Sequence, residues 1–258
     1  MDLSNSVLLI TGGSSGLGAA TALMALQAGA RVVIADLAEP RPETFPASDG
    51  LVYVRTDVAD EASAAHAVDT AVKHFGRLDV LVNAAGIGPA EKIHGKQGPH
   101  GLESFSRVIR VNLIGTFNMM RLAVPAMLSS GPPVQQDDAS ASQGVIINTA
   151  SVAAFDGQIG QTAYAASKGG VVAMTLPAAR DLARDRIRVL TIAPGIFETP
   201  MLMGLPQEVQ TSLGQTVPHP ARLGRPSEYA ALARSIIENE YLNGEVIRLD
   251  GGLRMAPR

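Results

Sequence analysis

The sequence predicts one α/β domain built on a doubly wound parallel sheet, with helices on both faces. Short apolar runs alternate along the chain with longer amphipathic segments, which is typical of right-handed β-α-β crossovers. Several of the apolar runs are uninterrupted stretches of Val, Ile and Leu, as expected for parallel strands that are buried on both faces. A glycine-rich turn directly follows the first of these runs, at the place where such sheets bind nucleotides.

Seven runs are predicted strands, and five longer segments are predicted helices. The strands are Val7–Ile10, Arg31–Ala35, Leu51–Arg55, Leu78–Val82, Val145–Ile147, Arg188–Ile192 and Glu245–Leu249. The helices are Leu17–Ala28, Glu61–Phe75, Leu102–Leu128 with breaks, Ala163–Ala183 and Ser227–Glu238. Asp60 and Ser227 lie where helix-starting residues are expected, and Pro177 should kink or end the helix that contains it.

The 258 residues are expected to form a single Rossmann-type catalytic domain over residues 1–258. Three stretches are predicted loops, namely Ala38–Gly50, Pro89–Gly101 and Ser129–Gly144. The series of strands resumes after each loop. We therefore expect surface insertions near residues 89–101 and 129–144 rather than linkers between domains.

The composition argues against several classes of protein. The net charge is -3 without a long basic run, so nothing indicates nucleic-acid binding. No apolar stretch reaches the roughly 18–20 residues that would span a membrane. The chain has no cysteine, which removes disulfides, thiolate chemistry and cysteine metal sites. The five histidines show no metal-ligand spacing, so we expect no metal site.

The sequence begins M-D-L-S-N-S-V-L-L-I, which runs almost directly into the first predicted strand. This segment has no charged leader and no small-residue cleavage site, so we expect no secretory signal. The absence of cysteine fits a reducing compartment. On these grounds the expected location is the cytoplasm.

The segment T-G-G-S-S-G-L-G carries three spaced glycines, Gly12, Gly16 and Gly18. Without a Cβ, these residues allow a tight turn, close approach of the backbone to a pyrophosphate and close packing of the next helix. The N–H groups at the start of that helix can then bind phosphates. A glycine cluster alone occurs in many proteins, but this one follows a strand and opens a helix, which favours a dinucleotide site.

Asp36 ends the second predicted strand, twenty residues after Gly16, near the spacing expected for the acid that binds the ribose 2′-hydroxyl. The alternative is a simple cap or turn residue. A carboxylate accepts hydrogen bonds from ribose hydroxyls but repels a 2′-phosphate, and no Lys or Arg lies in Ser14–Leu17 to neutralise that phosphate. The sequence therefore predicts NAD rather than NADP.

Two further strand ends are predicted to lie at the same edge of the sheet. Asp57-Val58 ends the third strand and could recognise adenine through the acid side chain and the valine backbone, or could be a plain turn. Asn83-Ala84-Ala85-Gly86 ends the fourth strand, where small residues would let a cofactor lie against the backbone.

Ser151, Tyr164 and Lys168 form the predicted chemical centre. Tyr164 and Lys168 are four residues apart, so on a helix they share one face. A free tyrosine titrates near pKa ~10, and a cation held close favours the phenolate. Ser151 follows a strand, so its hydroxyl and the phenol should meet at the carboxyl edge of the sheet. Together the three side chains indicate a proton relay for an alcohol/ketone reaction.

These residues together resemble the short-chain dehydrogenase/reductase family over nearly the whole chain. The motifs that carry the resemblance are T-G-G-S-S-G-L-G, Asp57-Val58, N-A-A-G, Asn112, Ser151, the Y-x-x-x-K pair and Pro194-Gly195. Within the family, V-N-L-I-G-T-F-N and N-G-E-V-I-R-L-D-G are similar to the type-2 3-hydroxyacyl-CoA dehydrogenase subgroup, also described as 17β-hydroxysteroid dehydrogenases. The loop Lys92–Gly101 resembles an insertion of that subgroup.

The resemblance implies a role for each matching position. Tyr164 would be the catalytic acid/base, Lys168 would lower its pKa and bind the nicotinamide ribose, and Ser151 would orient the substrate oxygen. Asn112 would support a water-linked proton path. The NAD site would be formed by Gly12, Ser15, Gly16, Leu17, Gly18, Asp36, Asp57, Val58, Asn83, Ala85, Gly86, Tyr164, Lys168, Pro194, Phe197 and Thr199. Relatives are commonly homotetramers, so a homotetramer is expected.

The expected reaction is the NAD-dependent interconversion of a secondary alcohol and a ketone, and the resemblance implies (S)-3-hydroxyacyl-CoA as the substrate. One alternative is a dehydrogenase for steroids or other apolar alcohols. A second is a 3-ketoacyl carrier-protein reductase, against which Asp36 argues, because such enzymes usually favour NADP. A third is a non-catalytic NAD-binding scaffold, against which the intact Asn/Ser/Tyr/Lys set argues.

A substrate lid is expected near residues 198–218, where the match to the family is looser. Glu198 could face substrate or solvent. Met201 and Met203 could line an adaptable apolar pocket or pack on the core.

Overall fold

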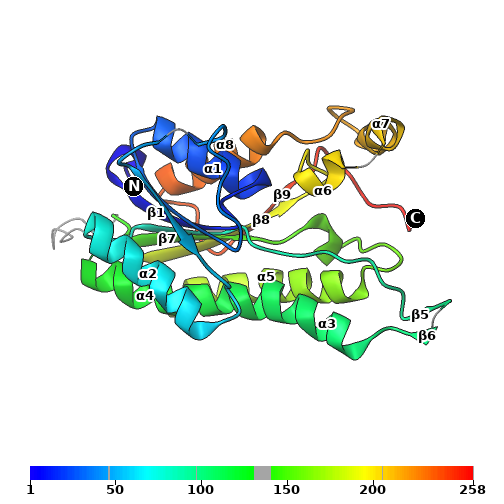
Figure 1. Ribbon diagram of the computed structural model, residues 1–258, viewed down its shortest axis with the longest axis horizontal. Coiled ribbons are helices and arrows are strands. Elements are labelled where there is room, and N and C mark those ends of the chain that lie inside the picture. Colours follow the sequence, from blue (N-terminus) through cyan, green and yellow to red (C-terminus); the bar gives the residue numbers. More distant parts are fainter. Residues whose placement is uncertain (46, 97, 131–140, 205, 258) are drawn as a thin grey trace.

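Figure 1 shows the computed structural model, a single sheet enclosed between two layers of helices. The structure describes residues 1–45, 47–96, 98–130, 141–204 and 206–257. Seven parallel strands make up the sheet: β1 (Val7–Thr11), β2 (Arg31–Asp36), β3 (Leu51–Arg55), β4 (Val80–Asn83), β7 (Gly144–Thr149), β8 (Ile187–Pro194) and β9 (Val246–Leu249). Each contains one of the predicted apolar runs or most of it, so the predicted fold class is confirmed.

The strand order is β3-β2-β1-β4-β7-β8-β9, and all six pairings are parallel. The order reverses between β1 and β4, which lie side by side although two strands separate them in the chain. The carboxyl ends of β1 and β4 therefore diverge into loops on opposite sides and leave a crevice, the usual ligand position in this type of sheet.

The helices cover the two faces of the sheet (Figure 1). Their bounds are α1 (Gly16–Gln27), α2 (Glu61–Phe75), α3 (Leu102–Ile109), α4 (Gly115–Ser130), α5 (Thr162–Asp181), α6 (Pro200–Met203), α7 (Gln207–Gln215) and α8 (Pro226–Glu238). One buried apolar cluster joins the sheet to α1 and α8, and a second joins it to α2, α4 and α5. The central strands β1, β4, β7 and β8 are buried along their whole length, which explains their largely apolar sequences, whereas the outer strands β3 and β9 are mostly only partly buried.

Two helix starts can be compared with the sequence. Asp60 is the N-cap of α2, and its carboxylate accepts a hydrogen bond from the Ser63 N–H at 2.7 Å, as predicted. In α8 the first helical residue is Pro226 rather than Ser227. Arg225 is the N-cap there, and the Glu228 side chain accepts its N–H at 2.7 Å.

The prediction that Pro177 ends or kinks its helix was wrong about the end, because α5 continues to Asp181. A proline in a helix interior leaves the carbonyl four residues earlier without its donor. Here that residue is Ala173, and both Ala173 and Pro177 are exposed, so water can satisfy the carbonyl. Pro125 is accommodated inside α4 on an exposed position in the same way.

The predicted long helix is one helical rod from Leu102 to Ser130 with a π-helical turn at Arg110–Ile114. By length and composition alone this rod could cross a membrane, although the sequence contains no uninterrupted apolar run of that length. Its packing explains the composition: α3 contacts α5, and α4 contacts α2 and the sheet. The rod therefore packs along one side on α2, α5 and the sheet, and its other side is exposed.

Short elements lie inside the predicted loops. Strands β5 (His94–Gly95) and β6 (Gly98–Pro99) pair as an antiparallel hairpin within the 89–101 insertion. Helices α6 and α7 lie within the predicted lid near 198–218. The other predicted insertion, near 129–144, falls for the most part outside the described residues.

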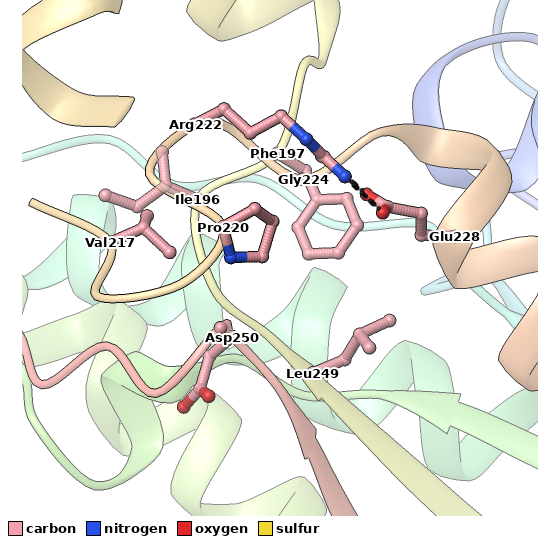
Figure 2. Close-up of a pocket in the computed structure, with 10 residues that line it drawn as sticks. Ile196, Phe197, Val217, Pro220, Arg222, Gly224, Glu228, Leu249 and Asp250 are labelled. Carbon is pink, nitrogen blue, oxygen red and sulfur yellow. Dashed lines mark hydrogen bonds and ion pairs between the residues drawn. The ribbon is translucent and has the colours of Figure 1, made fainter. Parts of the chain in front are cut away.

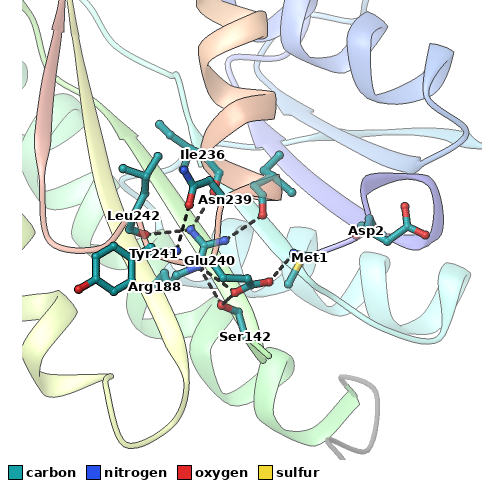
Figure 3. Close-up of polar contacts among 11 residues, drawn as sticks. Met1, Asp2, Ser142, Arg188, Ile236, Asn239, Glu240, Tyr241 and Leu242 are labelled. Carbon is teal, nitrogen blue, oxygen red and sulfur yellow. Dashed lines mark hydrogen bonds and ion pairs between the residues drawn. The ribbon is translucent and has the colours of Figure 1, made fainter. Parts of the chain in front are cut away.

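A buried arginine holds α8 against the edge of the sheet near the chain's first residue (Figure 3). The Arg188 guanidinium on β8 donates at 2.8–3.0 Å to the carbonyls of Ile236, Ile237 and Leu242. Its Nε donates to the Ser142 hydroxyl at 2.8 Å and lies 3.4 Å from the Glu240 carboxylate. The carbonyls that end α8 therefore have donors, and the buried charge has a counter-ion.

Candidate active site

One cavity of about 920 Å³ lies at the carboxyl edge of the sheet. It is lined by sixteen of the eighteen predicted site residues: Gly12, Ser15, Gly16, Leu17, Gly18, Asp36, Asp57, Val58, Ala85, Gly86, Ser151, Tyr164, Lys168, Pro194, Phe197 and Thr199. The glycine turn and the Ser-Tyr-Lys set come from segments more than a hundred residues apart in the chain. The fold brings them into one volume that is large enough for a dinucleotide and a small substrate.

The glycine turn is shaped by three backbone constraints. Gly12 and Gly16 have φ angles of 63° and 55°, which favour glycine. A Cβ on Gly12 would lie 2.8 Å from the Ala85 backbone, and one on Gly18 would lie 2.3 Å from the Gly12 carbonyl oxygen. The N-cap of α1, Ser15, makes no side-chain capping bond, so the first N–H groups of this helix are available to a phosphate.

Asp36 lies at the end of β2, as predicted, and its carboxylate lines the cavity. One carboxylate oxygen accepts the Ser14 N–H at 3.1 Å, and the other accepts the Ala38 N–H at 3.2 Å. These bonds fix the carboxylate beside the glycine turn. Each oxygen keeps a lone pair for a further donor such as a ribose hydroxyl.

The adenine end of the predicted site is formed by the strand-three motif. Asp57 is exposed, and its carboxylate accepts the Ala59 N–H at 2.9 Å. Val58 is buried against Gly115 of α4, where a Cβ would lie only 2.6 Å from the valine side chain. Both residues line the cavity, so either the acid or the backbone could meet a base there.

Asn83 does not line the cavity. It is buried at the end of β4, where its amide nitrogen donates to the Asn148 side-chain oxygen of β7 at 2.9 Å. Its own side-chain oxygen has no hydrogen-bond partner among the described residues. The structure thus places Asn83 beneath the cavity floor, while its neighbours Ala84, Ala85 and Gly86 line the wall.

The Ser-Tyr-Lys set is assembled by β7 and the first turns of α5. The Ser151 hydroxyl accepts the Ala153 N–H at 3.1 Å and hydrogen-bonds the Tyr164 phenol. The Lys168 ammonium is buried, donates to the Thr149 carbonyl at 2.7 Å and lies 5.8 Å from the centre of the Tyr164 ring. The predicted face shared by Tyr164 and Lys168 is confirmed, since both side chains line one cavity.

The electrostatics of this pair differ from the sequence expectation. Burial raises the pKa of Tyr164 above its ordinary value, and the hydrogen bond from Ser151 lowers it by less. Burial also lowers the pKa of Lys168, from 10.5 to about 8. The same desolvation acts in opposite directions because a phenol is charged when deprotonated and an amine is charged when protonated. In the protein alone, the lysine therefore does not make the phenol acidic.

Asn112 is fully buried in the π-helical turn and does not face solvent. Its side chain accepts the Ile87 N–H and donates to the Ile87 carbonyl, both at 2.8 Å, and it donates to the Ser167 hydroxyl at 3.0 Å. This amide clamps the loop after β4. The next glycine of that loop, Gly88, packs on Tyr164, since a Cβ there would lie 3.4 Å from the phenol ring.

Several residues in or next to the cavity were given no role from the sequence. Thr11 ends β1, and its hydroxyl accepts the N–H groups of Ala84 and Ala85 at 3.2 Å each, which joins the two loops that flank the crevice. Further cavity residues not predicted include Ile87, Arg107, Arg110, Gln158, Gln161, Ile196, Leu202, Leu213 and Met255. The sequence did contain a signal for two of them: Gln158 and Gln161 are polar residues that lie between the predicted Ser151 and Tyr164.

Some residues of the predicted lid line the cavity and others do not. Thr199 and Pro200 approach the glycine turn, because a Cβ on Gly16 would lie 3.6 Å from each of them. Glu198 does not line the cavity, nor does Met203, which is half-exposed. The side chain of Met201 lies outside what the structure describes.

A second, smaller cavity of about 200 Å³ lies behind the segment that carries Phe197 (Figure 2). The Phe197 ring is buried against Gly224, where a Cβ would lie 2.8 Å from it. Arg222 and Glu228 also line this cavity and form an ion pair at 2.6 Å. The ring therefore packs closely on the Gly224 backbone, and Phe197 lines both this cavity and the main one.

Within the described part of the chain, no group of three or more His, Asp or Glu side chains is placed to hold a metal ion. Comparisons with known proteins agree with the geometry. A family model described as short chain dehydrogenase matches residues 6–210. The 3-hydroxyacyl-CoA dehydrogenase type-2 of Drosophila melanogaster is 52% identical and covers 99% of this chain and 100% of that protein.

The protein of the same name from Homo sapiens is 52% identical and covers 97% of this chain and 96% of its own length. The crystal structure of 3-hydroxyacyl-CoA dehydrogenase type-2 from Mycobacterium avium is similar, with a TM-score of 0.88 and 38% identity over 98% of this chain and 97% of that one. These findings confirm the resemblance drawn from the motifs. The chain belongs to the short-chain dehydrogenase family and is an oxidoreductase that uses a nicotinamide cofactor.

Proposed function

We propose that this enzyme uses NAD to interconvert (S)-3-hydroxyacyl-CoA and 3-oxoacyl-CoA. The observation that supports the reaction class is that Ser151, Tyr164 and Lys168 share one cavity with the glycine turn. The substrate is supported by 52% sequence identity with relatives named 3-hydroxyacyl-CoA dehydrogenase type-2. The apolar side chains of the cavity, Ile196, Leu202, Leu213 and Met255, suit an aliphatic chain.

The cavity fits a dinucleotide at three points. The turn around Gly12 accepts no Cβ, the start of α1 has unpaired N–H groups for phosphates, and Asp36 has free lone pairs for ribose hydroxyls. When bound, oxidised nicotinamide supplies the acceptor for the hydride that leaves the substrate carbon. Phe197 and Thr199 would close the nicotinamide end, and Asp57 with Val58 would hold the adenine end.

The side chains of the protein handle the proton. In the oxidative direction Ser151 holds the substrate oxygen, and the Tyr164 phenolate takes the hydroxyl proton. The carbon–hydrogen electron pair leaves as hydride, so the products are a ketone and a neutral phenol. Lys168 holds positive charge beside the phenol, and Asn112 keeps the loop at Ile87 in place while the proton passes to water. In the reductive direction the phenol donates the same proton.

The preference for NAD over NADP rests on Asp36. Its carboxylate lies beside the glycine turn, where it would meet the ribose of a bound dinucleotide and repel a 2′-phosphate, and the glycine turn carries no Lys or Arg. In Asp36→Ala the ratio of kcat/KM with NAD to that with NADP should fall at least about tenfold, which corresponds to the loss of ~1.4 kcal/mol of discrimination. The control is Glu39→Ala, which removes an exposed acid that does not line the cavity. An unchanged ratio in Asp36→Ala would show that Asp36 does not determine the preference for NAD.

The substrate is tested by initial rates with NAD against three panels: 3-hydroxyacyl-CoA esters of both configurations, steroid alcohols and simple secondary alcohols. The proposal expects the highest kcat/KM with (S)-3-hydroxyacyl-CoA. The second candidate, a dehydrogenase for steroids or other apolar alcohols, is favoured by the same apolar lining of the cavity. A higher kcat/KM on the steroid panel would select it instead.

We also propose a homotetramer in the cytoplasm. The assembly is supported by apolar side chains exposed on the outer face of the helical rod, including Ile114, Phe117 and Leu128, and by Leu176 on α5. The location is supported by the absence of cysteine, which fits a reducing compartment. Microscopy of the tagged native protein tests the location, and enrichment in another compartment would refute it.

A further inference from the structure

The segment that follows β9 is fastened to the loop between Ser151 and Tyr164. The Gln158 side-chain amide donates to the Ala256 carbonyl at 2.9 Å, and the Ile159 N–H donates to the Pro257 carbonyl at 3.1 Å. The Gln158 N–H in turn donates to the Gln161 side chain at 2.9 Å. The end of the described chain is therefore tied by its backbone to the loop that lines the site.

A second set of contacts anchors the beginning of the same segment. The Arg248 guanidinium pairs with Asp156 at 2.8 Å and lies 5.0 Å from the centre of the Phe155 ring. It also pairs with Asp250 at 2.7 Å and donates to the Leu253 carbonyl at 3.0 Å. The segment 250–257 is thus held at both ends against the loop that follows Ser151. We call this segment the strap.

Met255 lies between these two anchors and lines the main cavity. It is half-buried, and its neighbour Ala256 is bonded to Gln158, another cavity residue. Met255 therefore belongs to the end of the cavity bounded by the Ser151–Tyr164 loop, which is the substrate end, and not to the glycine turn. Ile196, Leu202 and Leu213 supply the other large apolar side chains of the cavity.

We propose that Met255 is a specificity-determining residue that contacts the aliphatic chain of the substrate and limits its length. A methionine is unbranched and adaptable, so it can pack against chains of more than one shape. The strap keeps its backbone fixed, so the size of this side chain sets the space available. The assignment of an aliphatic acyl chain rests on the proposed function, whereas the position of Met255 in the cavity does not.

The test compares kcat/KM for a series of (S)-3-hydroxyacyl-CoA esters of increasing chain length. Each substrate methylene that becomes buried increases the binding affinity by about fourfold. Met255→Ala should raise the ratio of long-chain to short-chain kcat/KM by about tenfold, and Met255→Phe should lower it by a similar factor. Met203→Ala serves as the matched control, because Met203 is half-exposed and lies outside the cavity; its ratio should equal that of the wild type.

The outcomes separate this inference from the proposed function. If the wild type oxidises the acyl-CoA series and both Met255 variants keep its chain-length profile, the role of Met255 is wrong and the substrate stands. If the wild type acts on none of the esters, the substrate is wrong, and the same variants are then compared on apolar secondary alcohols of graded length. Parallel profiles there would also overturn the role of Met255. Should Met255→Ala fail to fold, Met255→Phe alone decides, through the direction of its shift.

Discussion

The buried ammonium of Lys168 destabilises the folded protein, because the charged group has lost most of its contact with water. Burial lowers the pKa of Lys168 from 10.5 to about 8, a difference equivalent to about 3 kcal/mol between the charged and neutral forms. The hydrogen bond to the Thr149 carbonyl offsets part of the desolvation. The site thus keeps a poorly solvated cation beside the Tyr164 ring.

This cost predicts how stability depends on pH. Because the folded pKa of Lys168 lies below its ordinary value, the unfolded chain binds more protons between pH 8 and 10.5. The free energy of unfolding therefore rises with pH across that window. Below pH 8 the desolvation cost of this group is present in full and does not change with pH. Tyr164 acts in the opposite sense above pH ~10, where its raised pKa makes the folded state retain a proton.

The measurement is denaturant unfolding of the wild type and of Lys168→Met at pH 8 and pH 10. The wild type should gain about 2 kcal/mol relative to the variant over this interval. Lys73→Met, which changes an exposed lysine on α2, is the control and should follow the wild type. Parallel curves for the wild type and Lys168→Met would show that the lysine is not desolvated.

At this scale the sequence could predict which side chains meet, but not the sign of their pKa shifts. Spacing places Tyr164 and Lys168 on one helix face, and strand ends place Ser151 beside them. The direction of the pKa shift at Tyr164 depends on how much water the assembled cavity excludes, which only the folded structure shows. The lowered phenol pKa remains a prediction for the enzyme with oxidised cofactor bound.

At the scale of elements, the turn between β1 and α1 is the part most tightly constrained by its backbone. Gly18 sits in the first turn of α1, directly above the Gly12 carbonyl. Gly12 in turn packs on the backbone of Ala85 after β4. One glycine turn therefore holds α1, β1 and the β4 loop at the separation that a pyrophosphate needs.

Gly18→Ala tests this element. A Cβ there would lie 2.3 Å from the Gly12 carbonyl oxygen, so the turn must open. We expect a loss of about 1–3 kcal/mol in the free energy of unfolding and at least a tenfold weaker binding of NAD by titration calorimetry. Gly169→Ala in α5 is the matched control, because the new methyl group meets only one atom, at 4.0 Å, and should be neutral or stabilise by about 0.5–1 kcal/mol. Equal behaviour of the two variants would contradict the close packing of the turn.

Periodicity identified the strands of the large sheet and five helical segments, but it did not predict helix α7 or the nature of the break inside the long helical rod. The π-helical turn that buries Asn112 carries no break residue, since Arg110–Ile114 reads as ordinary helix. Its cause is tertiary: the Asn112 amide bonds both polar groups of Ile87 across the gap between two elements. Pro177 is the opposite case. The sequence predicts a helix break there, but the helix continues, because the Ala173 carbonyl that the proline leaves without a donor is on an exposed position and can bind water.

For the whole molecule, the helical rod leaves an apolar stripe on the outside. Ile114, Phe117 and Leu128 are 44–52% exposed, and Arg121 and Pro125 between them are exposed too, at the three- and four-residue spacing of one helix face. Leu176 on α5 is 44% exposed. Such a stripe supports the proposed assembly from copies of this chain.

Phe117→Glu should therefore reduce the assembly to a smaller species, as measured by sedimentation equilibrium. A carboxylate placed against an apolar partner surface costs more than the contact it replaces. Tyr241→Glu is the control, because Tyr241 is 99% exposed and far along the chain from the stripe. A protein that is monomeric before any substitution, or a tetramer that persists in Phe117→Glu, would exclude this face as the interface.

The fold class and the seven strand segments could be predicted because several strands are uninterrupted apolar runs that alternate with helical segments. The order of the strands in the sheet was not part of that prediction. The shape of the substrate end could not be predicted. It depends on the strap that carries Met255 and on the loop around Gln158, which meet through backbone carbonyls that no side-chain pattern encodes. Residues that were not predicted lie at both ends of the cavity: Leu37, Thr56 and Ala59 flank the predicted cofactor motifs, and Gln158 and Met255 line the substrate end.

The most direct test of the central claim, that the Tyr164 phenol exchanges the substrate proton beside a bound nicotinamide, is a comparison of Tyr164→Phe with the wild type in turnover and in NAD affinity. The account predicts that kcat falls by at least about a hundredfold, the usual contribution of a general acid–base, while the dissociation constant for NAD stays within a few-fold. Turnover within a few-fold of the wild type would contradict it.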